Sequence, residues 1–204
     1  ANATPALQAA VSSTTDIPIL GTSVTDFGAA LEMDIDPAKG TGINVSGSSD
    51  GVEAGLYVDL VTELVPDANN VSVLYCSAEA NSVVQAEDFQ AAMKEKAPDV
   101  KVTTFTFSDS NDIQTVATSA IEGCDALYLP TDNQVASNMS IIRNVCEPAK
   151  VPVINGEEGQ CANGGLATVS INYYDIGRAC GEQAVKILRD GADVSTLPIE
   201  YAKD

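Results

Sequence analysis

Apolar runs alternate with amphipathic segments from residue 50 onward, and this alternation most constrains the fold. Four runs have the composition and length of buried strands, at residues 71–75, 102–107, 126–129 and 151–154. Between the last two runs, apolar side chains recur at helical spacing and line one helix face: Val135, Met139, Ile142 and Cys146. Strands joined by helices form right-handed crossovers in a parallel sheet. The sequence therefore predicts one complete α/β lobe over residues 49–164.

The flanking segments predict only part of another lobe. They predict helices over residues 5–13, 27–33 and 173–189, strands over 17–20 and 166–171, and an extended segment over 197–201. One or two strands cannot form a buried sheet between three helices. We therefore expect residues 1–48 and 165–192 to form a first lobe that is incomplete in this chain, and residues 193–204 to return to the second lobe.

Three glycine-rich passages separate these blocks, at residues 40–47, 163–165 and 191–192. Each is compatible with an ordinary turn. Together they also fit hinges in a chain that crosses three times between two lobes, because glycine absorbs large changes in φ and ψ.

The charge balance disfavours several classes of partner. Ten basic and 29 acidic residues give a formal net charge of −19, and such a field repels nucleic-acid phosphates and anionic lipid headgroups. No apolar run approaches the roughly 18–20 residues that cross a bilayer. Residues 1–5 are neither a signal peptide nor a lipidation motif, so we expect that such a segment was removed or that the chain begins within a longer protein.

The five cysteines include no C-x-x-C pair, and the chain has no histidine. We therefore predict no zinc or iron–sulfur site and no other cofactor. The cysteines are typical of small buried apolar residues. A Cys146–Cys161 disulfide is the alternative, which spacing alone does not decide.

Ligands of open parallel sheets bind at the carboxyl ends of the strands. Polar residues there also open helices, at Thr4-Pro5, with Thr4 as N-cap, at Asn81-Ser82 and at Thr131-Asp132. Free amides at a helix N-terminus suit a ligand carboxylate, although plain capping explains each one equally well. Four carboxylates could pair with a ligand ammonium or form a solvated acidic rim: Asp26, Asp132, Glu157 and Glu158.

Motifs of several enzyme classes are absent from the sequence, which has no P-loop, no H-E-x-x-H and no G-x-G-x-x-G. The adjacent pair Glu157-Glu158 does not by itself indicate a glycosidase. We therefore expect a binding protein and not an enzyme.

Four groups of residues resemble one family of ABC-transporter substrate-binding proteins, and the similarity covers essentially the whole chain. They are Ile17-Pro18-Ile19 with Val24-Thr25-Asp26, Tyr75 with Glu79-Ala80-Asn81-Ser82, Tyr128-Leu129-Pro130-Thr131-Asp132-Asn133, and Leu166-Ala167-Thr168-Val169 with Tyr173-Tyr174-Asp175-Ile176-Gly177-Arg178. The resemblance implies the two-lobed type I periplasmic-binding fold, in which helices cover both faces of parallel sheets. The better-known members of this family take up aromatic amino acids such as tryptophan, phenylalanine or tyrosine.

By this resemblance, residues of both lobes hold a small ligand between them, and an aromatic or other hydrophobic amino acid is expected. The expected contacts are Thr4, Pro5, Thr25, Asp26, Phe27, Asn81, Ser82, Thr131, Asp132, Glu157, Glu158 and Tyr174. Members of the family carry further residues before the Thr4-Pro5 helix. Phe27 stands where many members have proline, and its ring is expected either to form an aromatic wall of the site or to pack within the lobe.

A zwitterionic ligand needs donors for its carboxylate and a carboxylate for its amine. We expect the ligand carboxylate to lie near Asn81-Ser82 and Thr4. For the amine, Asp132 is the first choice, because it directly follows a buried strand, and Glu158 is the second.

The resemblance also implies a location and a partner. The protein is expected to be extracytoplasmic, as a cell-surface lipoprotein or in the periplasm, and to deliver its ligand to an ABC transporter permease. Contact with the membrane is expected only through a lipid anchor upstream of this chain. Two alternatives stay open: the ligand-sensing effector domain of a transcription regulator with the same fold, which the net charge disfavours, and a receptor for a nucleoside or sugar.

Overall fold

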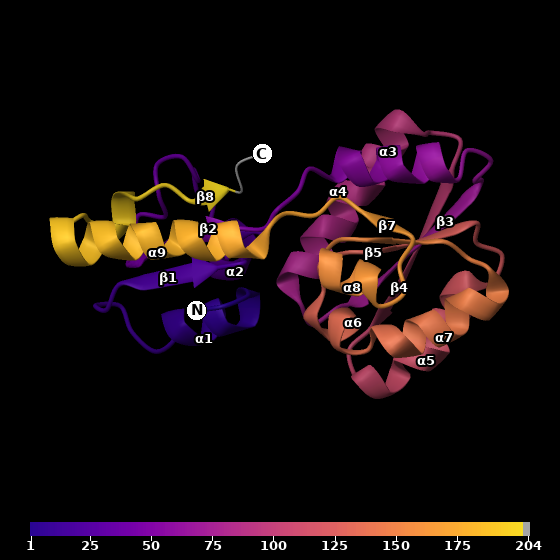
Figure 1. The fold of residues 1–204 in the computed structure, drawn as a ribbon, viewed down its shortest axis with the longest axis horizontal. Coiled ribbons are helices and arrows are strands. Elements are labelled where there is room, and N and C mark those ends of the chain that lie inside the picture. Colours follow the sequence, from indigo (N-terminus) through magenta and orange to yellow (C-terminus); the bar gives the residue numbers. More distant parts are fainter. Residues whose placement is uncertain (202–204) are drawn as a thin grey trace. The chain divides into compact units, whose positions relative to one another are not determined.

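A computed structural model describes residues 1–201 of the chain. The chain divides into two compact units: unit 1 comprises Ala1–Gly51 together with the chain from Ile171 onward, and unit 2 comprises Val52–Ser170. Figure 1 draws both units as ribbons. Each unit is built on a parallel sheet, so the predicted parallel α/β architecture is confirmed.

Unit 2 has five parallel strands in the order β4-β3-β5-β6-β7. Their bounds are β3 Asn70–Cys76, β4 Lys101–Phe107, β5 Ala126–Leu129, β6 Val153–Asn155 and β7 Ala167–Thr168. Val71 of β3 pairs with Val102 on one side and with Ala126 on the other. Since β3 and β5 are interior strands, their side chains are buried on both faces, which explains their mainly apolar sequences.

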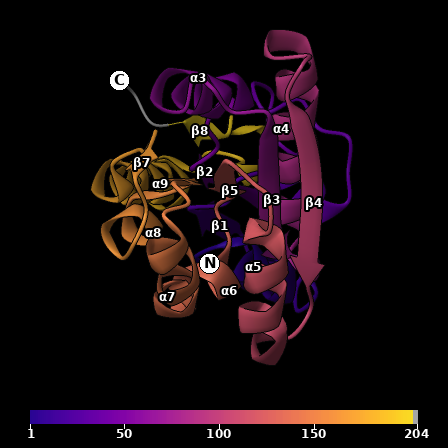
Figure 2. The same ribbon diagram turned by 90° about the vertical axis from the view of Figure 1, so that its right-hand side faces the viewer.

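Helices cover both faces of this sheet (Figure 2). Their bounds are α3 Ala54–Leu64, α4 Ala80–Lys96, η1 Ser110–Asp112, α5 Ile113–Ile121, α6 Asn133–Ser137, α7 Met139–Ala149 and α8 Glu158–Ala162. Alternate residues of β5 enter the two cores, because successive side chains of a strand point to opposite faces. Leu127 and Leu129 pack with α5 and α7, and Tyr128 packs with α3 and α4.

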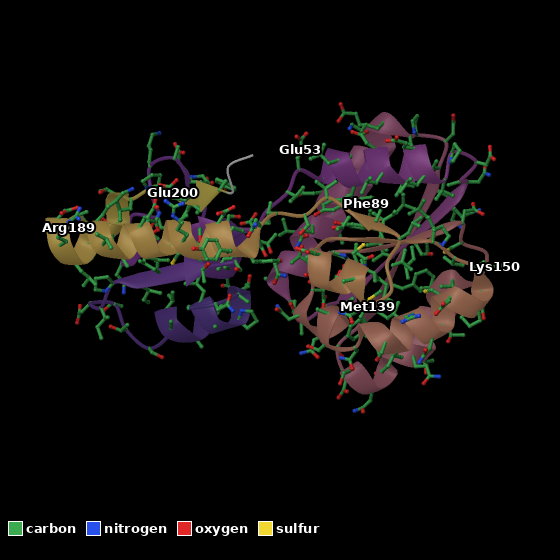
Figure 3. All side chains as sticks on the ribbon, viewed as in Figure 1. Glu53, Phe89, Met139, Lys150, Arg189 and Glu200 are labelled. Atoms are coloured by element: carbon green, nitrogen blue, oxygen red, sulfur yellow. The ribbon has the colours of Figure 1, made fainter. Side chains whose placement is uncertain are left out.

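Aromatic rings form the centre of the α3–α4 side of unit 2. The rings of Phe89 and Tyr128 are stacked with centroids 4.1 Å apart, and Tyr57 lies 5.3 Å from Tyr128. Figure 3 labels Phe89 in the interior of the unit and Lys150 at its periphery. The sheet that carries the candidate site therefore packs on an apolar interior.

Unit 1 has three parallel strands in the order β1-β2-β8, with bounds β1 Ile19–Thr22, β2 Val45–Ser49 and β8 Glu200–Tyr201. Two short helices, α1 Thr4–Val11 and α2 Phe27–Leu31, contribute to a small core that consists of Leu7, Ile19, Val24, Phe27, Ala30, Val45 and Ile199. The long helix α9, Tyr173–Asp190, packs against the strands of the sheet, and η2, Val194–Thr196, precedes β8.

Strand β2 overlaps the passage 40–47, for which the sequence predicts a turn or hinge. Its sequence is Val-Ser-Gly-Ser-Ser, so no apolar alternation marks it, yet all five residues are buried. Gly47 has a φ of 152°, and a Cβ at this position would lie 1.9 Å from Gly21 O of β1. Only glycine fits this contact between the two strands.

Two predicted lobe assignments are wrong. The strand expected in the first lobe over residues 166–171 is β7 of unit 2, because Ala167 pairs with Ile154 and Leu166 N donates to Val153 O at 2.7 Å. Residues 193–201 do not return to the second lobe, because β8 pairs with β2. The chain therefore passes between the units at residues 51–52 and 170–171, twice and not three times.

Two smaller expectations also need correction. Thr4 is the first helical residue of α1 and not its N-cap, a position that Ala3 takes with a φ of 68°. All five cysteines are free thiols, so Cys146 and Cys161 do not form a disulfide in this structure. Cys146 is buried, and its burial raises the pKa of the thiol to about 12.

Candidate ligand-binding site

The loops that follow β3, β5 and β6 meet at the carboxyl edge of the unit 2 sheet. Asn81 Nδ2 donates to Thr131 O at 2.7 Å, and Thr131 Oγ1 donates to Gly156 O at 3.1 Å. A Cβ on Gly156 would lie 2.3 Å from Thr131 N, so glycine is required where the two loops touch. The structure thus brings Asn81 and Thr131 together at one edge.

Asp132 is buried at this edge, with 1% of its surface exposed. It caps α6, because its Oδ1 accepts from Val135 N at 2.8 Å, and its Oδ2 accepts from Cys76 N at the end of β3, also at 2.8 Å. Burial raises the pKa of Asp132 to about 6, and the negative charge of Glu79 adds to the shift. Each oxygen thus already accepts from one backbone amide, and the carboxylate holds the start of α6 against the end of β3. A ligand amine at Asp132 stays a prediction.

Glu79 is a second buried carboxylate at α6, with 6% of its surface exposed. Its Oε2 accepts from Asn133 N at 3.1 Å and from Asn133 Nδ2 at 2.8 Å, and its Oε1 accepts from Gln134 N at 3.0 Å. Together Glu79 and Asp132 occupy the first three amides of α6, so the helix start at Thr131-Asp132 is closed to a ligand carboxylate. Sequence reasoning assigned Glu79 no role, although Glu79 lies just after a predicted strand and within one of the groups of residues that resemble the family.

The N-terminus of α4 differs from those of α6 and α8, because no side chain caps it. Asn81 and Ser82 lie in its first turn, and both are buried. Asn81 Oδ1 has no hydrogen-bond partner among the described residues. Of these three helix starts, α4 is therefore the one that no side chain caps, so its first backbone amides are the donors left for a ligand. The Asp132 carboxylate also lies near this turn, because it interacts with the Ser82 side chain.

The two adjacent glutamates of α8 have different environments. Glu157 is the N-cap and accepts from Gly159 N at 2.6 Å and from Gln160 N. Glu158, the first helical residue, is exposed and has no ion pair or hydrogen bond from its side chain within residues 1–201. Of the pair, Glu158 is thus the carboxylate that is free to meet a cation.

Further buried polar atoms at this edge lack hydrogen-bond partners among the described residues. They are both amide atoms of Asn155, Gln160 Oε1 and Thr168 Oγ1. Asn155 and Thr168 are partners in the β6–β7 register and so point to the same face of the sheet. Since a polar atom buried without a partner costs free energy, these atoms have hydrogen-bonding capacity left for water or for a ligand. Sequence reasoning missed them because their burial depends on tertiary structure.

Asp26 and Phe27 of unit 1 both have local structural roles. Asp26 caps α2 by accepting from Ala29 N at 2.8 Å. Phe27 is buried in the unit 1 core, where a Cβ on Gly21 would touch its ring at 3.1 Å. Phe27 therefore packs within the unit, and the alternative of an aromatic wall is wrong.

The remaining expected residues of unit 1 differ in accessibility. Thr4 is buried at the start of α1, whereas its neighbour Pro5 is exposed. Thr25 is partly buried, and Tyr174 is 76% exposed on the first turn of α9. Pro5 and Tyr174 are thus free to contact another molecule, and Thr4 is not.

One segment of unit 1 matches the G-x-S-x-G pattern of serine hydrolases: Gly47-Ser48-Ser49-Asp50-Gly51. Ser49 Oγ donates to Thr25 O at 2.9 Å and accepts from Gly51 N at 2.9 Å. The chain has no histidine that could serve as its base. The segment thus ends strand β2, and the serine is held by the backbone.

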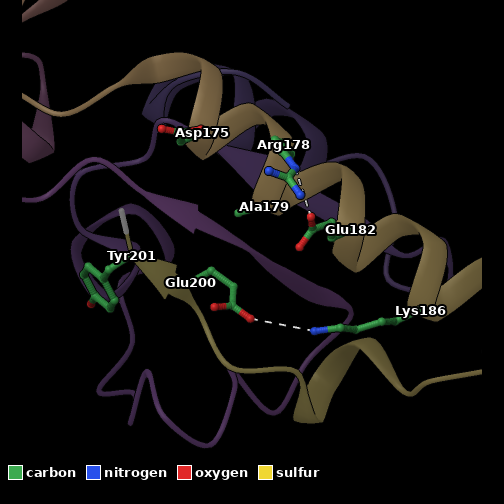
Figure 4. Close-up of a pocket in the computed structure, with 7 residues that line it drawn as sticks. All are labelled: Asp175, Arg178, Ala179, Glu182, Lys186, Glu200 and Tyr201. Atoms are coloured by element: carbon green, nitrogen blue, oxygen red, sulfur yellow. Dashed lines mark ion pairs between the residues drawn. The ribbon is translucent and has the colours of Figure 1, made fainter. Parts of the chain in front are cut away.

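A separate groove on unit 1 lies between α9 and β8 (Figure 4). Its lining consists of Asp175, Arg178, Ala179, Glu182, Lys186, Glu200 and Tyr201. Its charges are paired within the unit, with 3.1 Å between Arg178 Nε and Glu182 Oε1 and 3.8 Å between Lys186 Nζ and Glu200 Oε1. Such exposed pairs contribute little free energy and do not indicate a preformed site.

Two further features bear on function. None of the described helices combines the length and apolar character needed to cross a membrane. Residues 1–201 contain no group of three or more His, Cys, Asp or Glu side chains that could hold a metal ion.

Comparison with known proteins places this site in context. A tyrosine-binding protein of Clostridioides difficile (strain R20291) is 35% identical over 197 residues, which are 96% of this chain and 55% of that protein. An L-Trp complex of an ABC domain from Streptococcus pneumonia superposes with a TM-score of 0.91 at 32% identity, over 98% of this chain and 68% of that one. A ligand-free, open substrate-binding protein with adhesive properties from Clostridium difficile gives a TM-score of 0.71 at 37% identity, over 100% of this chain and 67% of that one.

The chain spans about half the length of the curated relatives it matches. Sugar-binding proteins and a transcriptional regulator that match at 10–17% identity share the fold alone. The model of one family, described as ABC transporter substrate binding protein, matches residues 1–204. This is a family of binding proteins and not of enzymes. The chain therefore belongs to the ABC transporter substrate-binding protein family.

Proposed function

We propose that this chain is the solute-binding part of an ABC importer and that its ligand is an aromatic amino acid. The names of two relatives support the ligand class, since one is a tyrosine-binding protein and the other was crystallised with L-Trp. The first turn of α4 is the observation in the molecule that carries the proposal.

The ligand carboxylate would lie at this first turn. Asn81 and Ser82 are buried there, no side chain caps the helix, and the positive end of the α4 dipole favours a negative charge. The neighbouring helix starts are already occupied by Asp132, Glu79 and Glu157. The ligand carboxylate would thus take the place at α4 that these side chains take at α6 and α8.

The ligand amine would pair with Glu158, which is exposed at the start of α8. Thr131 and Glu157 would also contact this ligand. Their loops are neighbours, because Thr131 bonds to Asn81 on one side and to Gly156, the residue before Glu157, on the other. Pro5, Thr25, Asp26 and Tyr174 of unit 1 stay ligand contacts predicted from the sequence. An ammonium–carboxylate pair and amide–carboxylate bonds together recognise an α-amino acid and not a sugar.

The remaining parts of the proposal concern the cellular setting. The protein would act outside the cytoplasm, held by a lipid anchor or free in the periplasm, and would release its ligand to a permease without chemical change. The net charge of −19 supports the absence of a nucleic-acid partner.

Direct binding measurements test the proposal. The chain contains no tryptophan. The fluorescence of added L-tryptophan, excited at a wavelength that tyrosine does not absorb, therefore reports binding without background from the chain. We expect saturable binding of L-tryptophan, competed by L-tyrosine and L-phenylalanine and not by indole, which lacks the zwitterion. Binding of indole as tight as that of L-tryptophan would contradict the zwitterion, and tight binding of a sugar alone would contradict the ligand class.

Asn81→Asp tests the position of the carboxylate. It places a negative charge in the first turn of α4 and removes the donor to Thr131 O. We expect at least a tenfold loss of affinity, which is about 1.4 kcal/mol. The matched control is Asn69→Asp, an equal charge change at an exposed residue just before β3, at the opposite edge of the sheet. Equal affinities in the two variants would remove α4 from the site.

A further inference from the structure

Glu79 connects two of the loops that carry the proposed site. It is the residue just before α4, and its carboxylate reaches the first turn of α6. Asn81, two residues further along, donates to Thr131 O just before α6. The start of α4 and the start of α6 are therefore joined by two contacts that flank the proposed position of the ligand carboxylate.

Asp132 makes the complementary connection. Its Oδ2 accepts from Cys76 N, which ties the same turn of α6 to the end of β3. The segment from Thr131 to Asn133 is thus held at both sides, by Asp132 toward the sheet and by Glu79 toward α4. Because a buried residue makes each connection, the segment has little freedom to move independently.

The partners of Glu79 explain why this residue is a glutamate. All three are N–H donors: Asn133 N, Asn133 Nδ2 and Gln134 N. An ionised carboxylate only accepts hydrogen bonds, and it therefore satisfies all three. A glutamine of the same shape would direct its own NH₂ group at one or more of these donors.

We propose that Glu79 is a positioning residue for the ligand: it fixes the Thr131–Asn133 loop against the first turn of α4, so that Asn81 and Thr131 meet the ligand in a single arrangement. This inference rests on the proposed function for the part that concerns the ligand. The part that concerns the loop stands on the hydrogen bonds alone. Such preorganisation increases affinity because the loop loses less freedom on binding.

The test compares Glu79→Gln with Glu87→Gln in the full chain. Glu87 is also on α4 but is exposed, so its replacement removes the same charge without a buried partner. We expect Glu79→Gln to raise amide exchange at Asn133 and Gln134 at least tenfold and to weaken L-tryptophan binding at least tenfold. Glu87→Gln should leave both measurements within twofold of the wild-type values.

A rescue variant separates positioning from general damage to the fold. In Glu79→Gln with Asn133→Asp, the direction of the side-chain hydrogen bond is reversed, because the new amide donates to the new carboxylate. Only this contact is restored, since the backbone Asn133 N also donates to Glu79 Oε2 in the wild type. We expect this double variant to recover part of the lost affinity, about threefold or more over Glu79→Gln. Affinity no better than that of the single variant would mean that the contact between these two side chains does not position the loop.

Failure of the inference and failure of the proposed function give different results. Increased exchange at Asn133 and Gln134 with unchanged L-tryptophan affinity would overturn the positioning role while leaving the ligand class intact. Unchanged exchange would overturn the hold on the loop itself. If the wild-type chain binds no aromatic amino acid, the proposed function is wrong, and the role of Glu79 in positioning that ligand is overturned with it.

Discussion

The two units bury their long helices in different ways. In unit 2, α4 and α7 contribute Phe89, Met93, Met139 and Ile142 to apolar cores on opposite faces of the sheet. In unit 1, α9 has 18 residues, but only Ile176 and Gln183 are buried. Leu188 of this helix is 86% exposed, although α9 is amphipathic and Leu188 is one of its large apolar residues.

Polar contacts to the backbone hold α9 in place. Ser48 Oγ of β2 donates to Ile176 O at 2.9 Å, and Gln183 Nε2 donates to Pro198 O at 2.8 Å. A hydrogen bond contributes roughly 0.5–1.5 kcal/mol net, whereas burial of one large apolar side chain contributes about 1.5–3 kcal/mol. One chain can therefore combine a unit whose long helices are held by apolar burial with a unit whose long helix is held in part by hydrogen bonds, and we expect unit 2 to be the more stable.

The largest effect should come from the interior of unit 2. Phe89 is fully buried and stacks on Tyr128, so Phe89→Ala removes apolar contacts and leaves a cavity. We expect a loss of about 3–5 kcal/mol in the stability of unit 2. Unfolding in denaturant, monitored by amide hydrogen exchange in β3 and β5, measures this loss of stability. A loss below about 1 kcal/mol would contradict the contrast between the units.

Acid pH should change the stability of unit 2 through Asp132. Its pKa is raised from 3.8 to about 6 in the folded state, so the folded state holds the proton more tightly. The stabilising contribution is fully present below pH 3.8 and is lost as the pH rises through about 6. A shift of this size corresponds to about 3 kcal/mol.

The Asp132→Asn variant isolates this contribution, because it cannot titrate at this position. The difference in unfolding free energy between wild type and variant should change between pH 4 and pH 7 in favour of the wild type at the lower pH, by up to about 3 kcal/mol. The carboxylates elsewhere are common to both proteins and cancel. Parallel pH profiles for the two proteins would show that Asp132 titrates near its ordinary pKa.

A smaller effect is expected in unit 1 from Ser48→Ala. This change removes the hydroxyl that bonds to Ile176 O of α9, and the expected loss is about 1 kcal/mol. Exchange protection of α9 amides provides the measurement. Ser13→Ala is the control, since the Ser13 hydroxyl bonds to Ala9 O at an exposed position. Equal effects of the two changes would show that Ser48 does not hold the helix.

The smallest effect is expected from Leu188→Ser on the outer face of α9. A side chain that is 86% exposed makes few contacts to lose, so the change in stability should stay within about 0.5 kcal/mol. Thermal unfolding of the variant and of the wild type measures this change in stability. A loss above about 1 kcal/mol would mean that this face of α9 is packed in solution, and the contrast between the units would then weaken.

The sequence predicted those parts of the fold in which local pattern and burial agree. Strand β5 was predicted with its observed bounds, because a buried parallel strand has a continuous apolar run. Strand β2 was missed, because its serines satisfy their hydroxyls with backbone carbonyls that come from distant parts of the chain. The two-residue strand β7 is too short for any periodicity to show which sheet it joins.

The candidate site was predictable only in part, because the hydrogen-bond partners of its polar residues depend on the folded chain. Position after a strand correctly predicted that Thr131 and Asn81 lie at the same sheet edge, because strand order implies it. Position could not distinguish a carboxylate that meets a ligand from one that caps a helix, as Asp132 and Glu79 do. That distinction depends on whether both oxygens already have donors, which is a property of the folded chain.

The way the chain passes between the units has a consequence for its synthesis. Unit 2 is one uninterrupted stretch, Val52–Ser170, whereas unit 1 is assembled from segments on both sides of it. On the ribosome, unit 2 has all its strands once residue 170 has emerged, and it can fold at that point. Strand β8 of the unit 1 sheet is translated only after unit 2. The nascent chain must therefore carry an unfinished unit 1 while unit 2 folds, and pauses in translation after residue 170 would prolong that exposure.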